Sequence, residues 1–355
     1  MVSEVETEGI VRQGENGQYG AGVKPATLRD IARMVGVSVA TVSKALNGRE
    51  HVRAETREAV RRAAQELNFR PNTLAQGLLA GRTGTVGLLT SDLEGRFSIP
   101  VLMGAEDAFG LGSTSVFLCD ARGDAIREQH HIRALLGRRI DGLIVVGDRT
   151  DARPSLGALP IPVVYAYAPS DNPEETSVVS DNVDAGRLAA DHLVSCGRTR
   201  IAYVSGDHSY AAARDRVQGA TAALRDTGIE LAGGGAFYGA WSEEWGRGAA
   251  RMLLDRFPDL DGILCGSDQV ARGVTDALRE SGRRIPEDIA VMSHDNWTQL
   301  AAEARPPLST IDMNLEEVGK AAARLLFAAI AGDPNPGLHT VPCKLVIRGS
   351  TGPAA

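Results

Sequence analysis

The chain has 355 residues, of which 43% are hydrophobic and 23% charged, and these values predict two or three soluble globular domains. No apolar run approaches the roughly 20 residues that a membrane helix needs. The N-terminus has no basic-then-apolar signal pattern, so we expect a cytoplasmic protein, associated with the nucleoid if it binds DNA. The four cysteines are far apart, which argues against a disulfide framework or a thiolate metal site. We expect plain buried thiols at Cys119, Cys196, Cys265 and Cys343.

Charge is distributed unevenly along the chain. The formal net charge is −7, yet residues 24–83 hold eleven Lys or Arg against five Asp or Glu. A small basic module joined to an acidic body is typical of a protein whose basic part binds nucleic acid. Residues 1–24 are acidic, Gly-rich and without periodicity, so we expect a disordered arm there.

The basic module has the pattern of a helix-turn-helix. Apolar residues recur at helical spacing over 28–35, and Thr27 with Asp30 forms a capping box at the start. Gly36 ends this helix, and Ser38 can cap a second one that runs to about Asn47. Two short helices joined by a tight Gly-containing turn define the motif. A third helix is expected over about 54–68.

The second helix is the candidate DNA reader, because an α-helix fits the major groove and its N-terminal residues lie nearest the bases. Lys44 can donate to guanine O6 and N7, whereas Val39 and Ala40 can offer only apolar contacts, for example to a thymine methyl. Polar residues beside them are placed to hold phosphates. These are Ser38, Thr41, Ser43 and Asn47.

The run DIARMVGVSVATVSKALNG, followed by V-x-x-x-T-R, ELNFRPN and A-Q-x-L, resembles the headpiece of the lac repressor family of bacterial transcription regulators. The resemblance makes Thr27, Leu28 and Asn72 further candidate DNA contacts. It also implies a hinge helix over 71–83 that forms on the operator and inserts Leu78 into the minor groove, as apolar wedges do.

Two positions depart from the family pattern. Arg53 stands where the family has a serine before the third helix, and the lost cap costs about 1 kcal/mol if nothing replaces it. Gly77 lies inside the hinge, where it costs about 1 kcal/mol relative to alanine. We therefore expect a hinge that is poorly helical away from DNA.

From Thr85 onward, strands and helices alternate. Continuous apolar runs indicate strands buried on both faces of parallel sheets. The strand-like runs are 86–91, 113–120, 141–147, 161–167, 200–207, 261–268 and 289–295. Helical stretches between them are 127–138, 186–197, 214–228 and 269–282. Ligands of open α/β sheets bind at the carboxyl ends of the strands.

This second part is similar to the effector domain of the same family. The matching motifs are V-x-x-D-N (178–182), R-D-R-V-x-G (214–219), C-G-S-D-Q-V-A (265–271), P-P-L-S-T-I (306–311) and L-V-I-R-G-S-T (345–351). The resemblance implies a two-lobed, doubly wound α/β domain like that of the periplasmic sugar-binding proteins, behind an all-α headpiece and a hinge helix.

The implied domains are the headpiece at 25–70, the hinge at 71–83 and an effector-binding and dimerisation domain at 84–355. Within that domain the N-lobe comprises about 84–181 and 312–342, and the C-lobe about 182–311 and 343–355.

The resemblance also implies an effector site between the lobes. Arg216 is the expected charged donor, Trp241 the aromatic that stacks on a sugar ring, and Asp268 with Asp295 the acceptors for hydroxyls. Asp92 and Phe97 come from the first strand-to-helix turn. Tyr167 stands where several family members place an acidic residue. This set favours a neutral polyhydroxylated ligand, a sugar, over a nucleobase.

We therefore interpret the chain as a homodimeric, effector-controlled repressor that binds a pseudo-palindromic operator in double-stranded DNA. The dimer surface is expected near 99–109 and 129–136. No catalytic set, metal spacing or cofactor loop is visible, and no membrane role is expected. The alternatives are a sugar-binding module without a DNA role, and a regulator that responds to a nucleoside or other metabolite as corepressor.

Overall fold

The computed structural model describes residues 26–46, 52–67, 69, 82–92, 94–110 and 114–352. The chain divides into two compact units, residues 1–76 and residues 77–355. Each unit has its own hydrophobic core. We describe the two units separately.

The first unit contains three short helices, α1 (Leu28–Val35), α2 (Val39–Leu46) and α3 (Ala54–Glu66). They pack around a small core, whose buried members are Ile31, Ala32, Val42, Ala45, Val60 and Ala63. The three predicted helices are confirmed.

The ends of these helices follow the local sequence signals. The Asp30 carboxylate accepts hydrogen bonds from the backbone N–H and the hydroxyl of Thr27, at 2.9 and 2.7 Å. Gly36 takes the left-handed conformation, with φ 74°, which glycine adopts without steric cost. The Ser38 hydroxyl accepts from the N–H of Thr41 at 3.1 Å. Arg53 occupies the N-cap of α3 and makes no side-chain cap, as predicted.

The second unit is built from two lobes, and each lobe has one six-stranded sheet. The N-lobe sheet has the order β11-β5-β4-β3-β1-β2, and all its strands are parallel. Its strands are β1 (Thr85–Thr90), β2 (Ser115–Asp120), β3 (Gly142–Val146), β4 (Val163–Ala166), β5 (Thr176–Ser180) and β11 (Gly337–Val341). Helices α5 (Ser98–Phe109) and α12 (Leu315–Ile330) cover one face, and α6 (Ala125–Gly137) covers the other.

The C-lobe sheet has the order β12-β10-β9-β8-β6-β7 and is parallel except for β12, which runs antiparallel to β10. Its strands are β6 (Ile201–Ser205), β7 (Phe237–Tyr238), β8 (Gly262–Cys265), β9 (Ala290–Asp295), β10 (Ser309–Asp312) and β12 (Lys344–Val346). Helices α7 (Asn182–Ser195) and α8 (Ala211–Asp226) cover one face, and α9 (Glu243–Arg256) and α10 (Asp268–Glu280) the other. A 3₁₀ turn (Ala232–Gly234) and the short α11 (Thr298–Ala301) complete the lobe.

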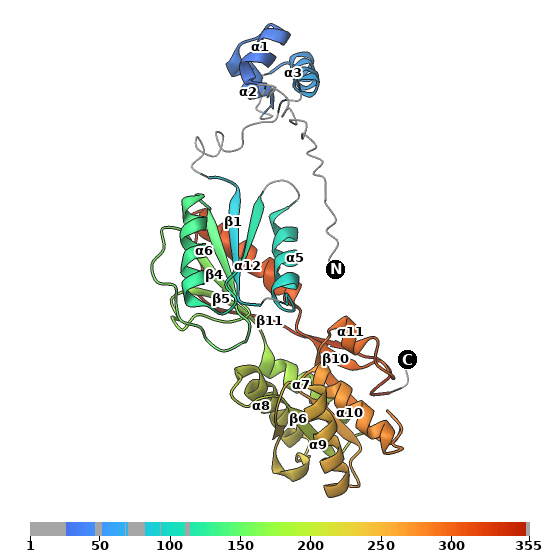
Figure 1. The fold of residues 1–355 in the computed structure, drawn as a ribbon. Coiled ribbons are helices and arrows are strands. Elements are labelled where there is room, and N and C mark those ends of the chain that lie inside the picture. The colour runs from blue at the N-terminus through green and yellow to red at the C-terminus, as the bar shows by residue number, and fades with distance from the viewer. Residues whose placement is uncertain are drawn as a thin grey trace, which may run out of the picture. The chain divides into compact units, whose positions relative to one another are not determined.

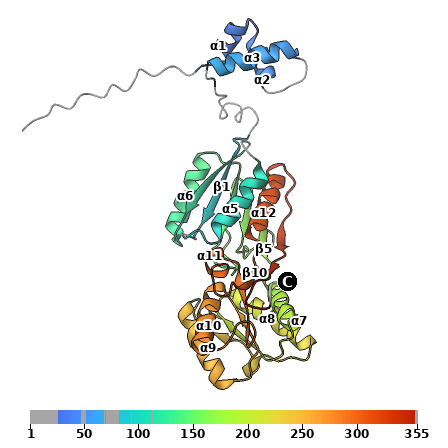
Figure 2. The same ribbon diagram turned by 90° about the vertical axis from the view of Figure 1, so that its right-hand side faces the viewer.

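The chain passes between the lobes three times, after β5, after β10 and after β11 (Figure 1). Figure 2 shows the layers, with α6 separated from α5 and α12 in one lobe, and α9 and α10 separated from α7 and α8 in the other. The carboxyl ends of β1 and β4 in the N-lobe, and of β6, β8 and β9 in the C-lobe, supply the residues of the cleft considered below.

The predicted α/β class is confirmed, as are the strands and helices that the sequence predicted from residue 85 onward. The predicted hinge helix over 71–83 lies almost entirely outside the described residues. The structure adds elements that the apolar runs did not indicate, among them β5, β10, β11 and α9. It also differs at β2, an edge strand in which Phe117 and Leu118 are each 44% exposed, so this strand is not buried on both faces.

Three pairs of helices are in close contact through glycines. A Cβ on Gly104 of α5 would lie 1.9 Å from the Glu316 carbonyl oxygen of α12, and one on Gly319 of α12 would lie 2.0 Å from that of Val101. The pairs α7–α8 and α9–α10 have the same reciprocal arrangement. The glycines that make it are Gly186 with Gly219, and Gly246 with Gly273. Only glycine permits this backbone separation, so these positions set the helix packing beside both sheets.

Candidate functional site

The outward face of α2 is the first candidate site. Its buried residues, Val42 and Ala45, face the headpiece core. Val39, Ala40 and Lys44 lie on the exposed side, and Val39 is 41% exposed. The predicted base contacts therefore share one solvent-accessible face of a short helix, with one cation and two small apolar side chains.

The predicted phosphate contacts lie around this face. Ser38 is exposed and caps α2, while Thr41 and Ser43 are half-buried. Thr27 is exposed at the start of α1. The Leu28 side chain packs against the headpiece core, so a DNA contact at this residue requires the backbone N–H, which has no partner within the helix at its first turn. The other predicted contacts, Asn47, Asn72 and Leu78, lie outside the described residues, as does Gly77.

The second candidate site lies between the lobes of residues 77–355, and its N-lobe wall is aromatic. Phe97 stacks on Tyr167, with ring centroids 4.6 Å apart and an interplanar angle of 17°. Burial raises the pKa of the Tyr167 hydroxyl, and the charges of Arg216 and Asp295 act on it from the C-lobe side. Asp92 accepts hydrogen bonds from the backbone N–H groups of Phe97 and Ser98 at 2.7 and 2.9 Å, so it caps α5.

The C-lobe wall is centred on Arg216, which is 3% exposed. Its guanidinium donates to the side-chain oxygen of Asn182 and to the carbonyl of Gly266, both at 2.8 Å. It also lies 3.6 Å from the carboxylate of Asp295. A buried charge is stable only when it is paired and hydrogen-bonded, and this arrangement provides both. The predicted pair of Arg216 and Asp295 is thus brought together, although much of the arginine is engaged within the protein.

Asp268 differs from the expectation. It has no exposed surface, and its carboxylate accepts from Ser293, Thr310 and the backbone N–H of Trp297, at 2.6, 2.9 and 2.7 Å. Burial, with the nearby Asp295 charge, raises its pKa to about 7. Because both oxygens already have donors, Asp268 holds the loop after β9 instead of lining the cleft.

Trp241 lies on the C-lobe wall against the residue that follows β6. Its ring covers Gly206, where a Cβ would come within 2.1 Å of the indole. Tyr210 meets it edge-on at 5.8 Å between centroids. The indole N–H is buried and has no hydrogen-bond partner within the part of the chain that the structure describes. Gly266, whose carbonyl accepts from Arg216, lies beside Gly206, so Trp241 borders the Arg216 site and its indole N–H is an available donor.

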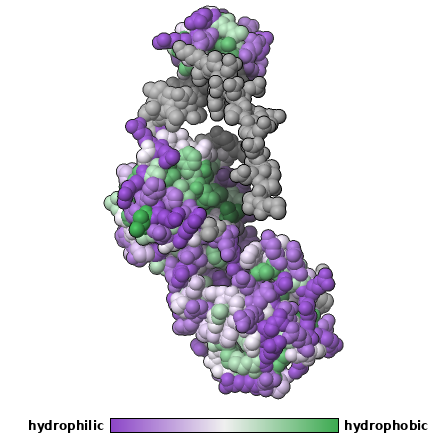
Figure 3. Space-filling model, viewed as in Figure 1, coloured by the Kyte–Doolittle hydropathy of each residue, from purple (hydrophilic) through white to green (hydrophobic). Residues whose placement is uncertain are grey.

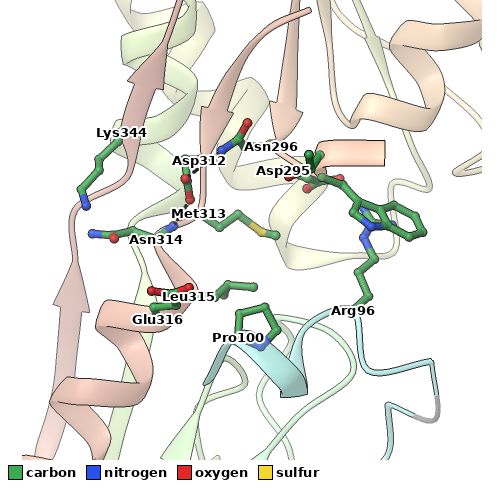
Figure 4. Close-up of a pocket in the computed structure, with 12 residues that line it drawn as sticks. Arg96, Pro100, Asp295, Asn296, Asp312, Met313, Asn314, Leu315, Glu316 and Lys344 are labelled. Atoms are coloured by element: carbon green, nitrogen blue, oxygen red, sulfur yellow. Dashed lines mark hydrogen bonds and ion pairs between the residues drawn. The ribbon is translucent and has the colours of Figure 1, made fainter. Parts of the chain in front are cut away.

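Sequence reasoning missed Arg96, which lies beside Phe97 at the start of α5. The Arg96 guanidinium forms an ion pair with Asp295 of the other lobe. It also lies 4.9 Å from the ring centroid of Trp297. These contacts border a pocket of about 410 Å³, where Figure 4 shows Arg96 reaching towards Asp295, with Asn314, Glu316 and Lys344 at the opposite end. No sequence signal marked Arg96, because its partners are distant along the chain.

None of the helices among the described residues is long and apolar enough to cross a membrane. The same residues contain no group of three or more His, Cys, Asp or Glu side chains that could hold a metal ion. The cysteines in this part of the chain are free, with Cys265 and Cys343 buried and Cys119 and Cys196 half-buried.

A part of each unit matches a known protein family. Residues 27–72 match the bacterial regulatory proteins of the lacI family, and residues 190–351 match the periplasmic binding protein-like domain. The HTH-type transcriptional regulator CelR of Thermobifida fusca is 35% identical over 330 residues, which cover 91% of this chain and 95% of CelR.

Two solved structures extend the similarity over 92% of the chain and 99% of each of theirs. A CelR–cellobiose complex superposes with a TM-score of 0.62 at 31% identity. The lac repressor dimer bound to operator and the anti-inducer ONPF superposes with a TM-score of 0.73 at 29% identity. The chain therefore belongs to the lacI family of bacterial regulatory proteins and is a DNA-binding transcriptional regulator.

Proposed function

We propose that the protein represses transcription by inserting α2 into the major groove of a pseudo-palindromic operator. The observation that carries this proposal is the outward face of α2, which combines Val39, Ala40 and Lys44. Lys44 donates to a guanine edge, and the two apolar residues contact thymine methyl groups. Phosphates are held by Thr27, Ser38, Thr41 and Ser43, by the backbone of Leu28, and by Asn47 and Asn72. Leu78 is the minor-groove wedge.

The effector is a neutral sugar bound between the lobes. Asp295 accepts from ligand hydroxyls, Arg216 and Phe97 border the ligand, and Trp241 stacks on an apolar ring face. The neighbouring pocket of about 410 Å³ is within the range of known small-molecule sites, roughly 300–1,000 Å³. The similarity to a regulator solved with cellobiose supports a sugar over a nucleoside.

The working unit is a homodimer joined through the N-lobe. Four large apolar side chains there are 42–53% exposed, and they lie on α5 and β2. They are Ile99, Met103, Phe117 and Leu118. Figure 3 shows apolar side chains gathered over this part of the lobe. An exposed apolar patch on a soluble protein indicates an interface. Ile126 at the start of α6 is also exposed, at 83%, whereas residues 129, 130 and 133 of that helix are polar or charged. We therefore place the centre of the interface on α5 and β2.

The test of DNA binding selects a site for the full-length protein from a pool of random duplexes and then measures affinity by fluorescence anisotropy. Lys44→Ala should weaken binding to the selected site by about 5- to 150-fold, as expected for one base contact worth about 1–3 kcal/mol. The matched control Arg284→Ala removes an exposed cation of the C-lobe and should leave affinity unchanged. Recovery of no pseudo-palindromic site would reject the proposal and favour a sugar-binding module without a DNA role.

The effector class is tested by thermal unfolding in the presence of neutral sugars and of nucleosides. A ligand at 100 times its Kd stabilises the native state by about 2.7 kcal/mol, so binding raises the midpoint. Sugars, but not nucleosides, should do so. The reverse pattern would favour the alternative in which a nucleoside acts as corepressor.

A further inference from the structure

The two lobes are joined across the cleft by an ion pair that the proposed effector site must accommodate. Arg96 belongs to the N-lobe and Asp295 to the C-lobe, 199 positions apart in the chain. Their side chains are only 17% and 5% exposed. Because the pair is shielded from water, its attraction is screened much less than that of a surface pair.

The Arg96 guanidinium is fixed in position by two aromatic rings. It lies 5.1 Å from the centroid of Phe97, which belongs to its own lobe, and 4.9 Å from that of Trp297 in the C-lobe. A cation over an aromatic face is attracted by the ring quadrupole, and more so when it is desolvated. Arg96 therefore makes two separate attractive contacts with the C-lobe, one with Asp295 and one with Trp297.

Asp295 also has a cationic partner within its own lobe. Arg216 lies 3.6 Å from its carboxylate. The backbone at Asp295 and at the next residue, Asn296, has φ values of 109° and 56°. Such conformations are unfavourable for residues with a Cβ and persist where the surroundings impose them, often at ligand clamps. Opening the lobes therefore withdraws Arg96 from Asp295, while Arg216 belongs to the same lobe as Asp295 and moves with it.

We propose that Arg96 is the positioning residue that holds the two lobes together, so that opening of the cleft to admit the effector requires rupture of the Arg96–Asp295 pair. This inference rests on the effector site proposed above. Under this proposal Asp295 pairs with Arg96 when the cleft is empty and with ligand hydroxyls when the effector is bound. The buried Arg96 Nε–H, which has no hydrogen-bond partner among the described residues, is then a donor that an incoming ligand oxygen can engage.

The test measures the distance between lobes in full-length protein without DNA or sugar. Spin labels are placed on Gln129→Cys of α6 and Asp226→Cys of α8, both exposed, and their distance distribution is recorded by pulsed electron resonance. The half-buried Cys119 and Cys196 are replaced by serine, and labelled chains are diluted into unlabelled protein.

Arg96→Gln should broaden the distribution and shift it to longer distances. The matched control Arg200→Gln breaks an exposed pair with Asp259 inside the C-lobe and should leave the distribution unchanged. Identical distributions for Arg96→Gln and the parent would overturn the proposal, as would equal broadening by both variants.

Asp295→Asn provides a second approach from the other lobe, for use if Arg96→Gln does not fold. By itself it should broaden the distribution relative to the parent, and an unchanged distribution would overturn the proposal. Where Arg96→Gln also folds, the double variant should add nothing further. Additive effects of the two substitutions would overturn the proposal. Because no DNA is present, these results are independent of operator binding, whose failure would reject the proposed function alone.

Discussion

Replacing Arg216 by methionine tests how much of the C-lobe wall depends on this one side chain. The substitution keeps an unbranched apolar stem but removes every donor. It leaves the Asn182 side-chain oxygen and the Gly266 carbonyl without the bonds of 2.8 Å that they accept. It also removes one of the two cations beside the buried Asp295.

The expected loss of stability follows from the hydrogen bonds and the ion pair that the substitution removes. A buried acceptor left without a donor costs about 1–3 kcal/mol, and removal of one member of a buried ion pair costs about 3–5 kcal/mol. We do not expect the full sum of these costs, because Arg96 still pairs with Asp295 and the methionine side chain fills part of the space left by arginine. We expect the free energy of unfolding of the second unit to fall by about 4 kcal/mol.

Urea unfolding followed by tryptophan fluorescence measures this loss in the second unit alone, since Trp241, Trp245 and Trp297 all lie in it. With a urea slope of about 3 kcal/mol/M, the midpoint should fall by more than about 1 M. The control Arg200→Met breaks an exposed pair and should cost less than about 1 kcal/mol. An Arg216→Met midpoint equal to that of the control would refute the reasoning that the contacts of Arg216 stabilise the second unit.

Two further predictions concern stability. Burial raises the pKa of Asp268 to about 7, from an unperturbed 3.8. Between these values the native state retains a proton that the unfolded chain has lost, so this contribution to stability is present at low pH and is lost as pH rises through about 7. Asp268→Asn should therefore reduce the fall in stability between pH 5 and pH 8, measured by urea unfolding, and an unchanged fall would contradict the assignment. Gly104→Ala should cost about 3 kcal/mol or more, because its Cβ would lie 1.9 Å from the backbone oxygen of Glu316. Its control Gly248→Ala, where nothing lies within 4 Å, should gain up to about 1 kcal/mol, and similar melting temperatures for the two variants would count against the packing argument.

The candidate DNA-binding site and the candidate effector site belong to different units. The face of α2 that we propose contacts DNA belongs to residues 1–76, and the Arg216–Asp295 pair belongs to residues 77–355. A variant such as Arg216→Met can therefore lose stability in the second unit while the headpiece retains its fold. This separation allows each site to be tested without disturbing the other.

Much of the candidate site could be predicted from the sequence, but the structural role of each carboxylate could not. Aspartates at strand ends were correctly located, yet Asp92 caps α5 and Asp268 is fully buried beneath the loop after β9. An aspartate at a strand end can cap a helix, link two segments by hydrogen bonds or contact a ligand, and the donors that surround it decide which. Those donors come from other segments, such as Ser293 and Thr310 for Asp268.

The sequence by itself determined the headpiece helices, because their signals are local. The capping of α1 by Thr27 and Asp30, the left-handed turn at Gly36 and the cap at Ser38 all act within a few residues. Apolar runs likewise indicated seven of the strands, whereas β5, β7, β10, β11 and β12 appeared only in the structure. Only the tertiary structure decided that Arg96 meets Asp295 and that paired glycines bring helices into contact. These contacts join residues far apart in the chain, and their partners are set by where strand ends and helix faces meet in space.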